Sequence, residues 1–481
     1  MNELIFELSV PGRKGYSLPE RDVPEMPLNG KFLRKEKAAL PELSELDIVR
    51  HFTVLSRKNF CVDTNFYPLG SCTMKYNSKA VEAIAGNEAF LAAHPVTAFL
   101  PGGEEHVQGM LSIVHGLEHA LSEITGMDAF CTHPLAGAHG EYAGLSLIAA
   151  YHRAKGNKKK HVIVPDSSHG TNPASAAFIG YDVITIPTRE NGDMDFEKFS
   201  AALTDEVAAV MLTCPDTLGI FNPHIREICD RAHTVDALVY YDGANLNAIM
   251  GKLRPGDVGF DVVHVNVHKT FGTPHGGGGP GAGPVGVKKH LIPFLPTPRI
   301  VKKKDTFSLI LDEPKSIGKV TSYFGNFGIL IRAYAYILLL GKEGLIDASE
   351  KAVLNANYVR ALLRDTYHEP YARACFHECV FSAAEQMKHD IHAIDIAKFL
   401  IDKGIHPPTV YFPITVPESI MIEPTETESK ETLDVFIAAM KEAAAFAVSD
   451  PDALHRAPVT TPVDRLDETS AARTMRVTCI G

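Results

Sequence analysis

Two polar residues at the ends of strand-like runs have the types needed for covalent chemistry with a cofactor. Asp242 ends the apolar run 238–241, and Lys269 follows after one further β-branched run. A lysine amine forms a Schiff base with pyridoxal phosphate. A carboxylate beside the pyridine nitrogen keeps that nitrogen protonated, so that the ring can accept electrons. The pair predicts a pyridoxal 5'-phosphate site with the Schiff base on Lys269.

The phosphate of such a cofactor needs backbone donors, which a glycine-containing turn at the start of a helix supplies. The segment Gly-Ala-His-Gly at 137–140 has this character, with the helix expected to start at Glu141. An ordinary turn before a helix is the alternative for this segment. The predicted phosphate contacts in it are Gly137, Ala138 and His139.

Three further side chains are candidates for the same site. His268 and Thr270 flank the lysine and are expected to reach the cofactor phosphate. His169 follows the strand-like run 161–165 and is expected to stack on the cofactor ring. A hydrogen-bonded loop histidine is the alternative for His169.

The elements that position these residues follow from alternating patterns. Apolar residues at helical spacing predict helices over 107–124 and 140–154. Between helical stretches lie runs that are apolar on both faces, which favours a mostly parallel sheet covered by helices. In such folds ligands lie at the carboxyl ends of the strands. The predicted strands are 161–165, 181–187, 207–212, 237–242 and 261–268.

The pattern changes along the chain and predicts three parts. Residues 1–60 are rich in proline and charge, and they predict an extended N-terminal arm. Residues 61–325 predict a large α/β domain that binds the cofactor. Residues 326–481 predict a long linking helix, a small α+β domain and a tail, with strands at 375–382 and 419–423 and helices at 392–403 and 430–448.

Composition excludes several classes of function. The chain has 481 residues, with 47 Lys+Arg against 58 Asp+Glu, so its net charge of −11 argues against a nucleic-acid partner. The longest apolar run, 329–340, is too short for a membrane span, and no secretion signal is evident. Scattered cysteines predict reduced thiols in the cytoplasm. No metal site is expected, because the helical pair His115 and His119 has no third ligand.

Several motifs resemble one family, the P-proteins of the glycine cleavage system. The resemblance covers about residues 66–450 and is most specific around Lys269. The length and the arm at 6–20 resemble subunit 2 of the form in which the P-protein is split into two chains. The matching motifs are FYPLGSCTMKYNSKA (66–80), GAHGEYAGL (137–145), DSSHGTNPASAAF (166–178), YYDGANLNA (240–248), NVHKTFGTPHGGGGPGAGPVGVKKHL (266–291) and EPTETESK (423–430).

The resemblance implies a fold and a set of site residues. The fold is that of pyridoxal-phosphate-dependent transferases, the aspartate-aminotransferase-like fold type I. Carried over by motif, Lys269 matches the cofactor lysine and Asp242 the partner of the pyridine nitrogen. Ala244 matches the small residue under the ring, His169 the stacking histidine, and Thr217 a threonine near the ring hydroxyl. Many relatives read Ser-Gly-Ala-Gln-Gly-Glu where this chain has Ala136-Gly-Ala-His-Gly-Glu, so the side chains that bind the phosphate stay open.

The resemblance also implies an activity and partners. The activity is that of glycine dehydrogenase (aminomethyl-transferring), an oxidoreductase: glycine loses CO2, and its aminomethyl group passes to the lipoyl group of the H-protein. The partners are glycine, the lipoylated H-protein and P-protein subunit 1, in an α2β2 heterotetramer. Two alternatives remain at this point: another fold type I enzyme, such as an aminotransferase or amino-acid decarboxylase, and a non-catalytic structural subunit.

Overall fold

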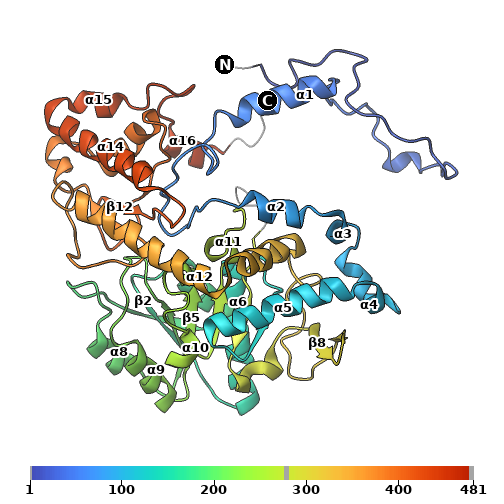
Figure 1. Cartoon of the computed structure of the whole chain (residues 1–481), viewed down its shortest axis with the longest axis horizontal. Coiled ribbons are helices and arrows are strands. Elements are labelled where there is room, and N and C mark those ends of the chain that lie inside the picture. The colour runs from blue at the N-terminus through green and yellow to red at the C-terminus, as the bar shows by residue number, and fades with distance from the viewer. Residues whose placement is uncertain (1–2, 276–280, 476–481) are drawn as a thin grey trace. The chain divides into compact units, whose positions relative to one another are not determined.

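The computed structural model describes residues 3–275 and 281–475. The chain divides into two compact units (Figure 1): Met1–Cys61 together with Pro458–Gly481, and Val62–Ala457. The part of the glycine-rich run after Lys269 that spans 276–280 lies outside the described residues. The predicted boundaries at 60 and 325 stay predictions.

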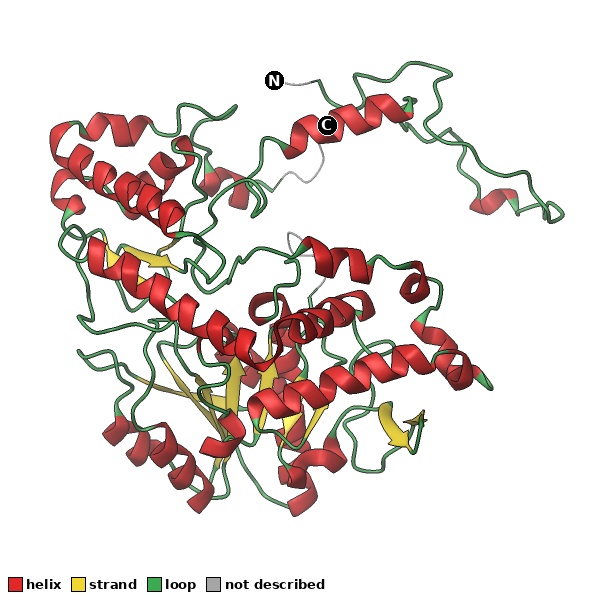
Figure 2. Cartoon of the chain, in the orientation of Figure 1, coloured by secondary structure: helices red, strands yellow, loops and turns green. Residues whose placement is uncertain are grey.

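A seven-stranded sheet forms the centre of the second unit (Figure 2). Its strand order is β1-β7-β6-β5-β4-β2-β3, and the strands from β6 to β3 pair in parallel. At the other edge, β7 pairs antiparallel with both of its neighbours, β6 and β1. This confirms the mostly parallel α/β sheet. The strands are β1 (Ala129–Cys131), β2 (His161–Pro165), β3 (Asp182–Ile186), β4 (Val207–Thr213), β5 (Leu238–Gly243), β6 (Val262–Val265) and β7 (Val285–Val287).

Alternate residues of each central strand pack on opposite faces of the sheet, because side chains alternate along a strand. One face packs against α6 (Gly137–Lys155), with Val162, Met211 and Tyr240 in one buried cluster with helix residues such as Ile148. The other face packs against α5 (Gln108–Thr125), α9 (Ile225–Thr234) and α12 (Phe327–Leu363). Burial on both faces explains why these strands read as continuous apolar runs.

A second, smaller sheet follows α12, which is interrupted at Gly341 by a non-helical backbone (φ 61°). Its three antiparallel strands are ordered β10-β12-β11, and a separate core surrounds them. This confirms the small C-terminal α+β part. The elements are β10 (Cys379–Ser382), α13 (Ala393–Asp402), β11 (Thr409–Val410), β12 (Ser419–Ile422), α14 (Lys430–Ser449) and α15 (Pro451–Arg456).

Two boundaries near the site differ from the sequence prediction. Helix α6 begins at Gly137 rather than Glu141, so the glycine-containing segment is the first turn of the helix itself. Strand β6 ends at Val265, and Lys269 lies in a short helical turn, α11 (Val267–Thr270). This turn forms because the carbonyl of Asn266 accepts the backbone N–H groups of both Lys269 and Thr270, each at 3.0 Å.

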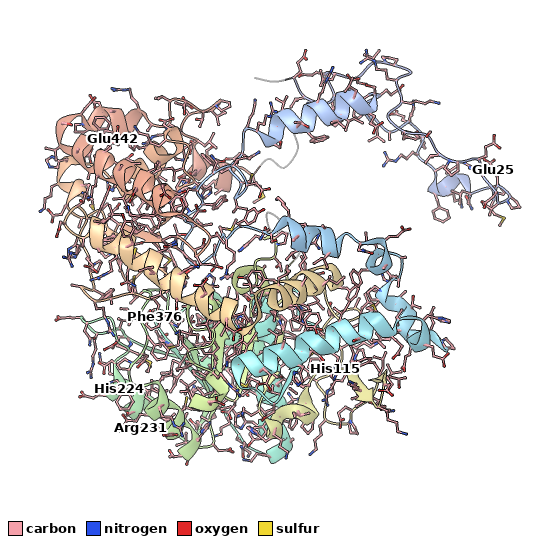
Figure 3. All side chains as sticks on the ribbon, viewed as in Figure 1. Glu25, His115, His224, Arg231, Phe376 and Glu442 are labelled. Atoms are coloured by element: carbon pink, nitrogen blue, oxygen red, sulfur yellow. The ribbon has the colours of Figure 1, made fainter. Side chains whose placement is uncertain are left out.

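The remaining elements include some that the sequence did not predict. The N-terminal arm contains the helix α1 (Glu45–Ser56), whose start is capped by Ser44. His115 lies on α5 (Figure 3), where its ring centroid is 5.3 Å from that of Phe307. Within residues 3–275 and 281–475, no helix combines the length and apolar character that a membrane span requires. The other elements are α2 (Lys79–Ala85), α3 (Glu88–Leu91), α4 (Gly103–His106), α7 (Thr171–Ile179), α8 (Phe196–Ala202), α10 (Pro255–Val258), α16 (Glu468–Arg473) and the hairpin β8 (Arg299–Lys303) with β9 (Thr306–Ile310).

Helix α6 approaches the sheet closely at one glycine, which gives a test of the packing. A Cβ atom at Gly144 would lie 2.3 Å from the ring of Tyr240. We expect Gly144→Ala to lower the free energy of unfolding by about 1–3 kcal/mol through overpacking. Gly109→Ala on α5 is the control, because that site is open and alanine favours a helix by about 1 kcal/mol. Thermal unfolding compares the two variants, and equal melting temperatures would contradict this packing.

Candidate functional site

A cavity of about 180 Å³ opens at the carboxyl ends of β4, β5 and β6, where the fold class predicts a ligand. Segments that are far apart in the sequence meet there. Of the ten residues predicted for the cofactor site, eight line this cavity: Gly137, Ala138, His169, Thr217, Asp242, Ala244, His268 and Lys269.

The other two predicted residues lie outside the lining of the cavity. His139 is half-buried, and its Nδ1 accepts the backbone N–H of Leu135 at 3.2 Å, so the ring caps the turn before α6. Thr270 is fully buried, and its hydroxyl has no hydrogen-bond partner. The carbonyl of Thr270 accepts a hydrogen bond from the Lys75 ammonium at 3.0 Å, which anchors the peptide beside Lys269.

The Asp242 carboxylate is held by donors from three directions. Oδ2 accepts from the Asn172 amide at 2.9 Å, and Oδ1 accepts from the Ala244 backbone N–H at 3.0 Å. His264 Nε2 lies 3.3 Å from Oδ1, and its Nδ1 is 2.7 Å from the Tyr240 hydroxyl. Burial opposes ionisation of Asp242, but these neighbours and the nearby charge of Lys269 outweigh it and hold its pKa below the usual range. Asp242 is therefore a buried anion at the wall of the cavity.

Glu141, in the first turns of α6, is a site residue that the sequence prediction missed. It is buried, and its two oxygens accept from the hydroxyls of Thr171 at 2.7 Å and Ser175 at 2.8 Å. Burial, together with repulsion from Asp242, raises the pKa of Glu141 to about 7. Two carboxyl groups beside one cavity thus have opposite preferences: Asp242 is ionised, and Glu141 is half-protonated near neutral pH.

The first turn of α6 has the features of an anion site. Its N-cap, Ala136, has no capping side chain, so the free N–H groups at the start of this 19-residue helix face the cavity at Gly137 and Ala138. A Cβ atom at Gly137 would lie 2.5 Å from the Asn266 amide oxygen, and one at Gly283 only 2.1 Å from the carbonyl of Ala136. Side chains at Gly137 and Gly283 would therefore collide with their neighbours, and the backbone at the start of α6 lies directly against the cavity.

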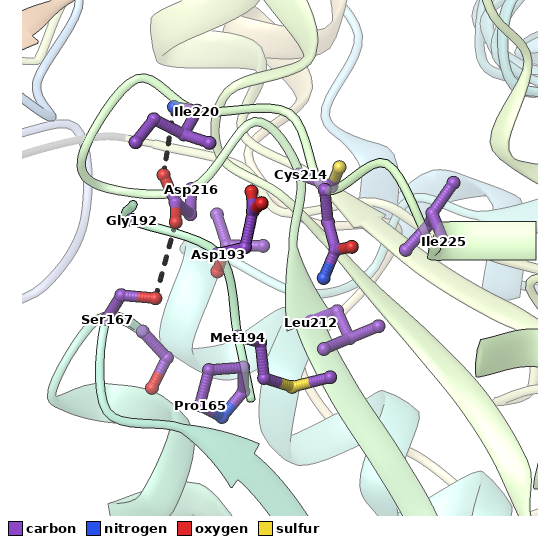
Figure 4. A pocket seen from close by; sticks show the side chains of 13 residues that line it. Pro165, Ser167, Gly192, Asp193, Met194, Leu212, Cys214, Asp216, Ile220 and Ile225 are labelled. Atoms are coloured by element: carbon purple, nitrogen blue, oxygen red, sulfur yellow. Dashed lines mark hydrogen bonds between the residues drawn. The ribbon is translucent and has the colours of Figure 1, made fainter. Parts of the chain in front are cut away.

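A half-buried carboxyl group, Asp216, lines a second pocket (Figure 4) and shapes the loop that carries Thr217. Asp216 accepts the backbone N–H groups of Leu218 and Ile220 at 3.0 and 2.9 Å and the Ser167 hydroxyl at 3.3 Å. The Thr217 hydroxyl donates to the carbonyl of Ser167 at 2.5 Å. Burial raises the pKa of Asp216 to about 7. The loop after β4 is thereby tied to the loop after β2.

His169 is placed at the mouth of the cavity. Its Nδ1 lies 2.8 Å from the Thr171 hydroxyl, and its ring centroid is 5.9 Å from that of Phe412 in an edge-to-face arrangement. Burial lowers the pKa of His169, with a smaller contribution from the charge of Lys269, so the ring is neutral. A neutral, flat ring fixed at one edge is suited to stacking.

Seven lining residues were not predicted from the sequence. Most of them lie at strand ends or inside the sequence motifs that contain the predicted residues. A search for polar side chains directly after predicted strands could have found those at the strand ends. Ser71 had no such signal, because it reaches the cavity from a segment far from the sheet in sequence. The seven are Ser71, Glu141, Thr171, Thr213, Asn245, His264 and Asn266.

Comparisons with known proteins agree with the geometry. Residues 348–449 match the family model described as glycine dehydrogenase, C-terminal domain, and residues 139–297 match that of aminotransferase class-V. The chain is 54% identical over 475 residues to the probable glycine dehydrogenase (decarboxylating) subunit 2 of Staphylococcus haemolyticus, covering 98% of this chain and 96% of that protein. It is 55% identical over 477 residues to the protein of the same description from Caldanaerobacter subterraneus, with 98% and 97% covered.

Solved structures show the same fold at low identity. A crystal structure of glycine decarboxylase (P-protein) of the glycine cleavage system, in inhibitor-bound form, matches with a TM-score of 0.71 at 22% identity, covering 86% of this chain and 94% of that one. A sphingosine-1-phosphate lyase from Burkholderia pseudomallei matches with a TM-score of 0.60 at 14% identity, covering 91% and 95%. Together with the aminotransferase match, these confirm the fold type I architecture.

The raised pKa of Glu141 predicts how stability depends on pH. Its folded pKa, about 7, lies above the ordinary 4.5, so the folded chain keeps a proton that the unfolded chain loses between these values. Stability should therefore fall by up to about 3 kcal/mol as the pH rises from about 4.5 to 7. Glu141→Gln should remove this loss while keeping hydrogen bonds to Thr171 and Ser175. Thermal unfolding of the cofactor-free chain from pH 5 to 8 measures it, and parallel curves for wild type and variant would contradict it.

Proposed function

The chain belongs to the family of glycine dehydrogenase (decarboxylating) subunit 2, and from this premise we propose that the cavity beside Lys269 is where it removes CO2 from glycine. It is a pyridoxal-phosphate-dependent enzyme of the glycine cleavage system, in which the remaining aminomethyl group passes to the lipoyl group of the H-protein. The single observation that carries the proposal is the placement of Lys269 and the ionised Asp242 at one cavity that also receives the start of α6.

The residues present fit pyridoxal phosphate in chemistry and in space. The Lys269 amine would hold the cofactor as a Schiff base, Asp242 would face its pyridine nitrogen, and the first turn of α6 would bind its phosphate. Unpaired buried atoms, the Asn266 amide oxygen and His268 Nδ1, also border the cavity. When bound, the cofactor supplies the electron-accepting ring that makes loss of CO2 possible.

The chain's own residues position and protect that chemistry. Contacts with Asn172, Ala244 and His264 keep Asp242 ionised. The negative charge of Asp242 would then keep the pyridine nitrogen of the cofactor protonated. His169 would stack on the ring face from the mouth of the cavity, and Thr217 would contact the ring hydroxyl. Ala244, whose backbone N–H is already used by Asp242, leaves space under the ring.

The family's name implies a companion, subunit 1, and we propose an α2β2 assembly. The arm supports this proposal. Residues 3–40 expose several large apolar side chains, which is typical of a surface that binds a partner. The charged residues and prolines of this segment keep it from forming a core of its own. The most exposed of them are Leu18 at 78%, Met26 at 83%, Phe32 at 86% and Leu40 at 75%. The lipoylated H-protein as the second partner and the cytoplasm as the location belong to the same proposal.

The experiment that tests the proposed function is removal of the lysine. We expect Lys269→Ala to abolish the visible absorbance that borohydride removes, and to cut glycine–bicarbonate carbon exchange by about three orders of magnitude or more. Lys351→Ala is the control, because that lysine forms only an exposed pair with Asp347 on α12. Exchange at the wild-type rate in the Lys269 variant would show that the cofactor is held elsewhere.

The arm gives a separate prediction about assembly. Deleting residues 2–40 should weaken association with subunit 1 by at least about tenfold, because the exposed apolar side chains leave with it. Cofactor affinity should change little, since none of the described arm residues 3–40 is among those that line the cavity. Analytical ultracentrifugation of the mixed subunits and cofactor titration separate the two effects. An unchanged association constant would contradict a docking role for the arm.

A further inference from the structure

Three ionisable side chains are buried together in the second unit, outside the lining of the cavity. His377 and Glu378 immediately precede β10, and Glu423 immediately follows β12. Each has an exposed fraction of 0%. His377 Nε2 lies 3.4 Å from Glu378 Oε1, and one atom from each of the three side chains lies within 4.8 Å of the others. Such groups are costly to bury unless something compensates them.

The hydrogen bonds of this cluster are incomplete at one carboxyl group. Glu378 Oε1 and both ring nitrogens of His377 have no hydrogen-bond partner. Glu423, in contrast, accepts from the Thr73 hydroxyl and backbone N–H and from the Asn247 amide. Both oxygens of Glu423 are therefore occupied, and the cluster is short of free ligands for a metal ion. A proton needs only the unpartnered oxygen of Glu378.

A strained turn connects the cluster to the cavity. Ser71, which lines the cavity, donates its backbone N–H to Glu378 Oε2 at 2.7 Å, and Thr73 donates its own to Glu423 Oε2 at 3.0 Å. Ser71 and Thr73 have φ angles of 60° and 46°, a left-handed backbone that is strained at non-glycine residues. The two carboxyl groups thus hold a turn at the wall of the site in a conformation that it would not adopt alone.

The charges around the pair do not balance. Lys269 and Lys75 act electrostatically on Glu423, and Lys269 also acts on Glu378. Lys75 already forms a buried ion pair with Glu426, at 2.6 Å. That leaves Lys269, whose charge also acts on Asp242, to face the two buried carboxyl groups, and two neighbouring like charges cannot both persist there.

We propose that Glu378 and Glu423 hold a single proton between them, on the unpartnered oxygen of Glu378 in the arrangement seen here, so that the pair presents one negative charge to Lys269. The pair would act as a positioning element: it holds the Ser71 turn and sets the charge opposite the lysine nitrogen. The inference rests on the proposed function, because it takes Lys269 to be the cofactor lysine.

The titration behaviour of the surrounding groups supports this sharing. Burial raises the pKa of Glu378 well above its usual range, and burial also raises that of Glu423. Burial lowers the pKa of His377 to about 3, so the ring adds no charge. Several charged or titratable groups face the cluster. They are Lys269 and His275 after β6, Cys72 and Lys75 on the turn segment, Asp216 after β4, Cys379 at the start of β10, and Glu426 after β12.

Glutamine variants test the sharing through the pH midpoint of the cofactor's visible absorbance in the full-length chain loaded with pyridoxal phosphate. In Glu378→Gln or Glu423→Gln, the remaining glutamate ionises alone, so the local charge and the midpoint should stay nearly unchanged. In the double variant the charge is lost, and the midpoint should fall by about one pH unit or more. Glu118→Gln is the control, because Glu118 is another glutamate with a raised pKa, about 8, on which Lys269 is not among the causes.

The outcomes are distinct. Equal downward shifts in each single variant that add in the double variant would mean two separate anions and would overturn the shared proton. An unchanged midpoint in the double variant would overturn any action on Lys269. Absence of the borohydride-sensitive absorbance from the wild-type chain would instead count against the proposed function.

Infrared spectroscopy keeps the inference testable if the double variant does not fold. The chain is labelled with ¹³C at the glutamate carboxyl groups, and the carbonyl band of protonated acid is measured near neutral pH without cofactor. Either single variant should lose the intensity of one protonated carboxyl group, because its remaining glutamate becomes ionised. A single variant with undiminished intensity would overturn the shared proton.

Discussion

A buried carboxylate stays ionised only if hydrogen-bond donors and positive charges surround it. Asp242 is the residue of this site that depends on such surroundings. Its donors come from α7, from the backbone after β5 and from the Thr213 hydroxyl at the end of β4, and His264 on the neighbouring strand β6 lies 3.3 Å away. This set requires β5 to lie beside β6 in parallel and α7 to start at the same edge of the sheet. The order of the sheet and the chemistry of the site are thus linked through one side chain.

The same edge of the sheet sorts its carboxyl groups by their surroundings. Hydrogen bonds and the nearby charges of His264 and Lys269 hold the pKa of Asp242 low, whereas for Glu141 and Asp216 burial outweighs the hydrogen bonds and raises the pKa to about 7. Groups of one chemical kind therefore differ in charge within a few residues of the cavity. Environments that push pKa values apart are typical of sites that handle protons.

The two lysines nearest the site differ in how their charges are compensated. Lys75 forms a buried ion pair with Glu426. Its ammonium group also donates a hydrogen bond to the carbonyl of Thr270, next to Lys269. Lys269 is left free of any buried ion pair among the described residues and faces the cavity. A lysine that is held at its backbone but not tied at its amine is the arrangement that covalent attachment of a carbonyl compound requires.

The sequence by itself predicted the mostly parallel sheet, because continuous apolar runs indicate burial on both faces. It also predicted that Asp242 and Lys269, which follow such runs, lie at one edge of that sheet, and both line the cavity there. It did not determine the start of α6 or the helical turn at Lys269, because glycine-rich and polar segments have no periodicity to set a boundary. The role of His139 was also beyond it, since capping a turn depends on backbone direction.

Ser71, Glu378 and Glu423 became site neighbours only in the tertiary structure. The hydrogen bond from Ser71 to Glu378 joins residues 307 positions apart, and that from Thr73 to Glu423 joins residues 350 apart. Local patterns carry no record of such pairs. The folding of the chain decides which buried charges meet, because only the packed interior removes the water that would otherwise keep them independent.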